Sequence, residues 1–484
     1  MNLNLKELSH DKLIELIESL ILEVNQLKEE NKILKEENRI LKEENQRLKA
    51  QLGLNSSNSS KPPSTDGFKK KLKNNSLREK TDKTSGGQPN HKGHTLKKVD
   101  TPDFTVDIKD DICPCCSSNL QDISPVHVTS RQVFDIPLPK IQVTEYKAYH
   151  KVCPHCNTKN NPVFPDNVTQ PVSYGSNIQS LVTYLNVQNH IPYNRVTSLV
   201  NDLFNCNLSE GTVFNILNKA YDSLETTEAE IKRRLLDSPQ IHADETGFYV
   251  ENLRQWLFSY SNKNYTFYDF HKKRGKEAMD FIGFIENYKG ILTHDCWKTY
   301  EQYENCLHSF CNAHFLRELN GIMETTEFKF PKEIKETLLS MKKLVDTGNI
   351  ISKEVRDSMI SQYYSQLHKG FEEELKTNPP NLTRSRKQGR KKQSPAKNLL
   401  LRLSKIPEVL GFFIKPDLIP FDNNLAERDI RMVKVKQKVS GLHRSTKGAK
   451  QFCRIRGYIS TIVKNNINIW DAITSIFTKS PIMP

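Results

Sequence analysis

The chain has 484 residues, 36% of them hydrophobic, and a formal net charge of +14, which together predict a protein of roughly two to four domains that binds a polyanion. No apolar run of about 18 residues occurs, and the N-terminus lacks the basic-then-apolar pattern of a signal peptide, so we expect a cytoplasmic location and no membrane partner. In such a chain the ten cysteines are expected to be metal ligands or buried thiols rather than disulfides.

Residues 1–52 are predicted to form a coiled coil, because their hydrophobic pattern repeats every seven residues. The repeat consists of Leu27, Leu34, Leu41 and Leu48, and the first three are followed four residues later by Asn31, Asn38 and Asn45. Leucine at d positions and asparagine at a positions favour two strands paired in register. We therefore expect a homodimer or higher oligomer, with a single charged helix as the alternative. Residues 53–100, rich in Gly, Ser, Pro and Lys, are predicted to be a basic disordered linker.

Residues 101–165 contain two Cys-x2-Cys pairs, Cys113 with Cys116 and Cys153 with Cys156. Between them, "RQVFDIPLPKIQVTEYKAYHKV" is rich in β-branched and aromatic residues and predicts strands. Zn²⁺ in structural sites is held by four ligands in a tetrahedron, which two such pairs supply. We therefore predict a four-cysteine structural zinc site in a β module. Two pairs of buried thiols are the alternative, and Cys115 is expected to be a bystander.

Residues 166–236 are predicted to form a helical domain. Val196, Leu199, Val200 and Leu203 have helical spacing, and Ser209 is a plausible N-cap for a second helix. The two helices are typical either of a helix-turn-helix motif or of a plain helical hairpin, since the second carries few basic residues.

Residues 237–320 alternate between strand and helix patterns. Strands are expected at "QIHADETGFYV", "QWLFSYS", "YTFYDFH", "GILTHDC" and "NCLHSFC", with helices at "GKEAMDFIGFIENY" and "NAHFLREL". This order predicts an RNase H-like mixed sheet in which the first and fourth strands are central neighbours. Asp244 lies inside the first strand and Asp295 ends the fourth, so the two carboxylates are expected to meet.

Two buried carboxylates repel each other unless a cation lies between them. Mg²⁺ takes oxygen ligands and keeps open positions for phosphates, and a two-metal site promotes phosphoryl transfer. Two acids rarely suffice for such a site, so a third is expected from a later helix.

Residues 321–420 are too long for a loop and are predicted to be a helical insertion that carries a basic loop. Residues 421–484 are expected to complete the core and begin with "FDNNLAERDIR". There Asn424 and Glu427 have the spacing of a capping box, although Asp422 or Asn423 could cap the helix instead. Glu427 is therefore either part of a helix cap or the third acid.

The chain resembles the DDE transposases of the insertion-sequence-66 family over nearly its whole length. The resemblance rests on the leucine repeat, "NSSNSSKPPSTDG", "GGQPNHKGHTL", the paired cysteines, "HADETGF", "HDCWKTY", "CNAHFLREL" and "NNLAERDIR". It implies a multidomain α+β protein whose RNase H-like core uses Asp244, Asp295 and Glu427 to hold Mg²⁺ or Mn²⁺. The implied activity is strand cleavage at transposon ends and strand transfer into target DNA in the bacterial nucleoid, where accessory element-encoded proteins can be partners.

Four residues near these acids are predicted to have other roles. Glu245 is expected on the opposite face of the first strand in a structural role, whereas His242 shares the face of Asp244 and is expected to support it or to pack in the core. Cys311 and His314 resemble half of a metal site, but ordinary packing is favoured because no second pair is visible.

The positive charge is concentrated in residues 61–98, 384–397 and 431–456, which carry net charges of +8, +7 and +9. These blocks favour a nucleic-acid partner, with solvated tails and faces as the alternative. The residues expected to contact DNA are Arg386, Lys387, Arg390, Lys391, Lys392, Arg428, Arg431, Lys434, Lys436, Lys438, Arg444 and Lys447.

Two other functions are compatible with part of the sequence. A zinc-containing DNA-binding regulator without catalysis would explain the charge but not the two strand-embedded aspartates. An RNase H-like nuclease would explain the aspartates but would cut DNA without joining it.

Overall fold

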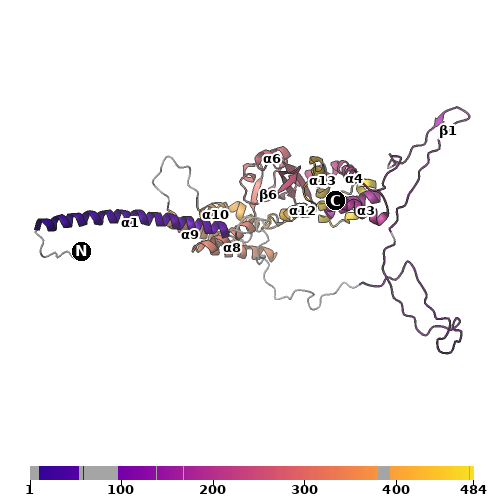
Figure 1. Ribbon diagram of the computed structural model, residues 1–484, viewed down its shortest axis with the longest axis horizontal. Coiled ribbons are helices and arrows are strands. Elements are labelled where there is room, and N and C mark those ends of the chain that lie inside the picture. The colour runs from indigo at the N-terminus through magenta and orange to yellow at the C-terminus, as the bar shows by residue number, and fades with distance from the viewer. Residues whose placement is uncertain are drawn as a thin grey trace.

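The structure is a computed structural model that describes residues 10–53, 58, 96–137, 139–166, 168–379, 393–478 and 480–484. These residues form a long N-terminal helix, an extended cysteine-containing segment, and a packed body of helices around one five-stranded sheet (Figure 1). The α+β fold class is therefore confirmed. Within the described ranges, no helix combines the length and apolar character needed to cross a bilayer.

The N-terminal helix α1 (His10–Gly53) projects from the body as a single rod (Figure 1). It contains many strong helix formers, and neither Pro nor Gly interrupts it before Gly53. Leu27, Leu34 and Leu41 expose 52%, 55% and 57% of their surfaces. The heptad stripe is thus uncovered in the part of the chain that the structure describes.

The cysteine-containing segment has less β structure than its sequence predicts. In the described residues it contains the antiparallel pair of β1 (Lys151–Val152) and β2 (Lys159–Asn160), and one isolated antiparallel bridge between Ile112 and Asn119. Of residues 131–152, where strands were expected, only Lys151–Val152 forms one, and the expectation is wrong for the other residues described there, which lie in no ladder. A strand requires a neighbouring backbone, whereas here the Gln132 side chain bonds to both backbone groups of Val99.

The central sheet has the strand order β5-β4-β3-β6-β7. Its strands are β3 (Gln240–Val250), β4 (Leu253–Ser261), β5 (Thr266–His271), β6 (Ile291–His294) and β7 (Leu307–Phe310). The first three form an antiparallel meander, and β6 and β7 are added in parallel to β3. The predicted adjacency of the first and fourth strands is confirmed, which makes the sheet consistent with an RNase H-like core.

Helices cover both faces of this sheet. On one face, α5 (Glu225–Leu236) and α6 (Lys276–Ile282) pack with the 3₁₀ turns Ile285–Asn287 and Tyr300–Gln302. On the other face lie α12 (Asn424–Ser440) and α13 (Thr446–Lys464), followed by α14 (Ile469–Thr478). Gly457 allows α13 to lie close to β5, because a Cβ atom there would be 3.1 Å from the carbonyl oxygen of Thr266.

The helices before the sheet share a hydrophobic core with α13 and α14. They are α2 (Ser176–Thr183) with a π-helical turn at Tyr184–Gln188, α3 (Tyr193–Phe204) and α4 (Glu210–Ser223). Ser209 is the N-cap of α4, as predicted, and its Oγ accepts a hydrogen bond of 3.1 Å from the backbone N–H of Thr212. The α3–α4 hairpin therefore packs on the sheet domain through α13 and α14.

The segment between β7 and α12 is helical, as its sequence predicts, and has a hydrophobic core of its own. It consists of α7 (Asn312–Thr325), α8 (Phe330–Asp346), α9 (Lys353–Thr377), α10 (Pro395–Leu403) and α11 (Ile406–Ile414). Tyr363 and Phe413 are fully buried there. This insertion separates Asp295 from Glu427 along the chain.

Candidate active site

Asp244 and Asp295 lie at the same edge of the sheet. β3 and β6 run in parallel, and their last paired residues are His242 and Thr293. Each aspartate follows two residues later, so the register of the strands brings the two side chains level. Charge repulsion from Asp295 is one cause of the raised pKa of Asp244.

Burial raises the pKa of both carboxyl groups. Desolvation raises the pKa of Asp244 well above its ordinary value, and the negative charges of Glu245, Asp295 and Glu427 add to the effect. Desolvation, followed by the charge of Glu245, raises the pKa of Asp295 to about 7. A bound cation would offset the repulsion between these buried carboxylates. Their ligand atoms are all oxygens, which fits Mg²⁺ or Mn²⁺.

Glu427 lies in the first turn of α12, and its negative charge contributes to the raised pKa of both aspartates. The ligand oxygens of the three acids are not gathered into one cluster in the described chain. Asn423 fixes where α12 begins. The Asn423 side chain donates from Nδ2 to the carbonyl oxygen of Ala243 at 2.8 Å, so its Oδ1 accepts from Nδ1 of His242 at 2.9 Å. The backbone N–H of Asn423 donates to Sγ of Cys311 at 3.2 Å. These bonds attach the start of α12 to the end of β7 and to the strand that carries Asp244.

The capping-box alternative for Asn424 and Glu427 is wrong. Asn424 is the first residue of α12, and its N-cap is Asn423, whose side chain makes no capping bond. Oδ1 of Asp422 accepts the backbone N–H of Asn424 at 3.0 Å. The side chain of the N-cap residue, Asn423, bonds to His242 and Ala243 of β3 and so does not cap the helix. The Glu427 carboxylate takes no part in a cap.

Glu245 lies on the opposite side of β3 from Asp244. Its carboxylate, which is 2% exposed, accepts hydrogen bonds from Nη2 of Arg274 at 2.5 Å and from the Tyr300 hydroxyl at 2.6 Å. The Arg274 guanidinium lies 4.7 Å from the ring centroid of Trp256 and 4.2 Å from that of Trp297. Glu245 is thus held in a packed ion pair, from which it raises the pKa of Asp295.

The two cysteine pairs form two matching turns. In the first, the backbone N–H of Cys113 donates to the carbonyl oxygen of Ser118, and in the second that of Cys153 donates to Thr158, both at 2.9 Å. Hydrogen bonding to Ser118 and to Thr158 lowers the pKa of the Cys116 and Cys156 thiols, respectively. Each turn therefore presents two sulfurs suited to a thiophilic metal, although the four sulfurs are not gathered into one cluster in the described chain.

Comparison with protein families assigns most of the chain. Residues 171–451 match the model described as "Transposase IS66 family". The chain belongs to the IS66 family of DDE transposases. Residues 110–157 of the transposase match the zinc-finger binding domain of transposase IS66, and residues 6–97 match a family of unknown function. No curated protein matches the chain.

The predicted DNA-contacting residues of the transposase fall into three groups. Five are exposed: Arg428, Arg431, Lys438, Arg444 and Lys447. Two are half-buried, since Nζ of Lys434 donates to the carbonyl oxygen of Gly247 at 2.6 Å and burial lowers the pKa of Lys436 to about 8. The remaining five lie outside the described residues: Arg386, Lys387, Arg390, Lys391 and Lys392.

The structure favours a helical hairpin over a groove-reading motif for α3 and α4. The inner face of α4 is buried against α13 and α14, and its outer face exposes Glu210, Asn215, Lys219 and Asp222. Arg444 lies 3.8 Å from Glu210, as measured from Nη1 to the carboxylate. An outer face with two acids and one lysine lacks the positive charge that DNA phosphates attract.

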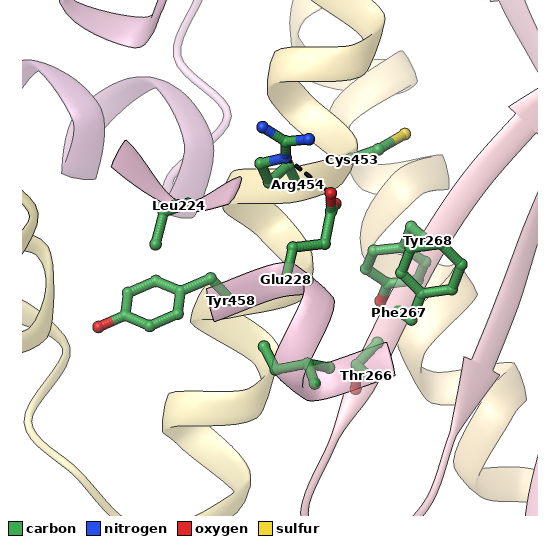
Figure 2. A pocket seen from close by; sticks show the side chains of 10 residues that line it. Leu224, Glu228, Thr266, Phe267, Tyr268, Cys453, Arg454 and Tyr458 are labelled. Atoms are coloured by element: carbon green, nitrogen blue, oxygen red, sulfur yellow. Dashed lines mark hydrogen bonds and ion pairs between the residues drawn. The ribbon is translucent and has the colours of Figure 1, made fainter. Parts of the chain in front are cut away.

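A separate small pocket lies between α5, β5 and α13 (Figure 2). Nε of Arg454 is 2.7 Å from the Glu228 carboxylate, and Nη1 donates to the carbonyl oxygen of Tyr221 at 2.9 Å. Apolar and aromatic side chains form most of the remaining lining. This ion pair connects α13 to α5 and is distinct from the three acids.

One group near Glu427 was not predicted from the sequence. Cys311, His314 and Glu427 have ligand atoms that all lie within 4.8 Å of one another. Burial raises the pKa of the Cys311 thiol to about 12 and lowers that of the His314 imidazole to about 3. The Cys-x2-His spacing was the available signal, but the third member comes from a distant segment.

Proposed function

We propose that this protein catalyses metal-dependent cleavage of DNA strands at the ends of its element and joins the freed 3′-hydroxyl to target DNA. The observation that carries the proposal is that Asp295 and Glu427, from two other segments, act with burial to raise the pKa of Asp244. A cation bound by the three carboxylates would remove this repulsion. Family membership supports the same class of phosphoryl transfer.

In this proposal Asp244, Asp295 and Glu427 hold Mg²⁺ or Mn²⁺, which supplies activation of the attacking oxygen and stabilisation of the leaving oxygen. The protein orients the carboxylates: Asn423 fixes α12, and the parallel register fixes the aspartates. Arg428 and Arg431, exposed on the same helix as Glu427, would neutralise the phosphates of the bound strand.

The test is an assay with the full-length wild-type protein, a labelled duplex that carries an end of the element, and Mg²⁺ or Mn²⁺. Binding, cut strands and joined strands are measured separately, with Glu427→Gln alongside. Metal-dependent cutting and joining that Glu427→Gln abolishes are expected. Binding without cutting would favour a regulator, and cutting without joining a nuclease.

We further propose that Cys113, Cys116, Cys153 and Cys156 hold one structural zinc ion. The matching turns, their lowered thiol pKa values and the zinc-finger family match support this. Replacing Cys153 by serine is expected to remove about one equivalent of zinc, because a structural zinc site uses four protein ligands. Elemental analysis of the purified protein measures the loss, with Cys115→Ser as the matched control. Unchanged zinc content in Cys153→Ser would contradict the site.

The partner that we propose for α1 is a second copy of α1. Its exposed stripe includes Val24 and Leu27, and Asn31 and Asn38 are polar groups that pair best with their own copies across a two-fold axis. Replacing Leu27 and Leu34 with serine is expected to halve the mass measured by light scattering, because each leucine buries its side chain only in the pair. The same change at exposed Glu29 and Lys32 is the control. A wild-type monomer would exclude the pairing.

A further inference from the structure

Cys311, His314 and Glu427 bring three different donor atoms to one place. Cys311 directly follows β7 and is the N-cap of α7. His314 lies in the first turn of α7, and Glu427 lies in the first turn of α12. Their sulfur, nitrogen and oxygen atoms all lie within 4.8 Å of one another. Metal–ligand bonds of about 2.0–2.3 Å place the tetrahedral ligands of one ion roughly 3.3–3.8 Å apart, so small side-chain movements would bring these three atoms onto one ion.

Two features of the group suit a bound cation. Nδ1 of His314 is buried and has no hydrogen-bond partner in the described chain, and an unpaired buried nitrogen is costly. Sγ of Cys311 is held in place by the backbone N–H of Asn423, which donates to it at 3.2 Å, and it lies at the N-terminus of α7 beside His314. Cys311 itself is fully buried.

We propose that Cys311, His314 and Glu427 form a binding site for zinc or a chemically similar transition-metal ion. Thiolate and imidazole donors select such an ion over Mg²⁺, whereas the Asp244–Asp295 pair offers oxygen only. Three protein ligands leave one tetrahedral position open. The site is separate from the four-cysteine module and shares only Glu427 with the acid group.

The shared carboxylate gives the site a regulatory consequence, which rests on the proposed function. In the present arrangement Nη2 of Arg317 lies 3.9 Å from Oε1 of Glu427, a weak contact that a bound ion would replace. An ion held by Cys311 and His314 would keep Glu427 from the aspartates. Zinc is therefore expected to inhibit Mg²⁺-dependent cleavage, and less so when Cys311 is replaced.

The site itself is tested without DNA, using Co²⁺ as an absorbing substitute for Zn²⁺. The parent protein is the full chain with Cys113, Cys116, Cys153 and Cys156 changed to serine, which removes the other thiolate site. One equivalent of cobalt with a sulfur-to-metal charge-transfer band is expected. Cys311→Ser should abolish the band, and His314→Gln should weaken binding at least about tenfold.

The matched control is Cys306→Ser, which removes another buried thiol, one residue before β7, and should leave the band unchanged. Circular dichroism confirms that each variant is folded. If the parent does not fold, zinc is counted in the wild type by elemental analysis, and Cys311→Ser should lower it by one equivalent. A band or a zinc count that Cys311→Ser does not change overturns the site, whatever the cleavage assay shows.

Discussion

Replacing Asp295 with asparagine is expected to lower Mg²⁺-dependent DNA cleavage by roughly 1000-fold, the size of loss seen when one preorganised charge-stabilising group is removed. The same substitution should make the metal-free protein more stable at pH 8. These opposite effects have one cause, because the carboxylate that holds the cation is a buried negative charge when the cation is absent. The measurements are initial cleavage rates and urea unfolding in buffer without divalent ions.

The stability gain should depend on pH. In the folded protein Asp295 keeps its proton up to a pKa of about 7, whereas an unfolded aspartate loses it near pH 4. Between these values the folded state binds more protons, so the free energy of unfolding falls as pH rises through this window. We therefore expect Asp295→Asn to gain about 1–3 kcal/mol at pH 8 and nothing at pH 4.

Asp269 is the matched control for Asp295. It is another strand carboxylate whose pKa burial raises, but it lies on β5, away from the three acids. Asp269→Asn should keep wild-type cleavage, and Mg²⁺ should still increase its stability at pH 8 by preferential binding to the folded state. If Asp295→Asn cleaves DNA at more than a tenth of the wild-type rate, Asp295 is not a catalytic metal ligand.

Replacing Asp429 with alanine is expected to destabilise the protein by about 3–5 kcal/mol, because it leaves a buried lysine without its counter-ion. Oδ2 of Asp429 lies 2.8 Å from Nζ of Lys464, and the two side chains are 9% and 14% exposed. The Ser460 hydroxyl donates to Oδ1 of Asp429 at 3.2 Å. These contacts hold α12, two residues beyond Glu427, against α13.

Two further variants distinguish the effect of leaving a buried charge unpaired from the effect of removing a side chain. Glu277→Ala removes the partner of Lys273 from an ion pair of 2.8 Å whose side chains are 65% and 64% exposed, and should change stability by less than about 1 kcal/mol. The double variant Asp429→Leu/Lys464→Met removes both buried charges and should recover most of the loss. Thermal unfolding measures all three, and a loss below 1 kcal/mol in Asp429→Ala would exclude the mechanism.

The sequence predicted the sheet because its signals are local. The strand of Asp244 and the apolar run before Asp295 each have the length and composition of a buried strand, and the order of elements then restricts their neighbours. The N-cap at Ser209 was predictable for the same reason, since the residues that decide it are three apart.

The details around Glu427 depend on distant residues and could not be predicted in this way. Asn423 has the sequence features of a helix cap, but its side chain bonds to His242, 181 residues earlier. The grouping of Cys311 with Glu427 likewise depends on how the helical insertion folds. The half-buried state of Lys434 and Lys436 follows from packing against β3 and Phe452, which a charge count does not show.

The helical insertion has a consequence for folding and synthesis. Contacts between residues far apart in sequence form slowly, because a long loop must close before they contribute. The two aspartate strands can pair early, whereas α12 is synthesised only after the whole insertion and is then held by Lys464 of α13. We expect the three acids to come together only after α12 and α13 have both been synthesised, so that nascent chains lacking these helices should have no cutting activity.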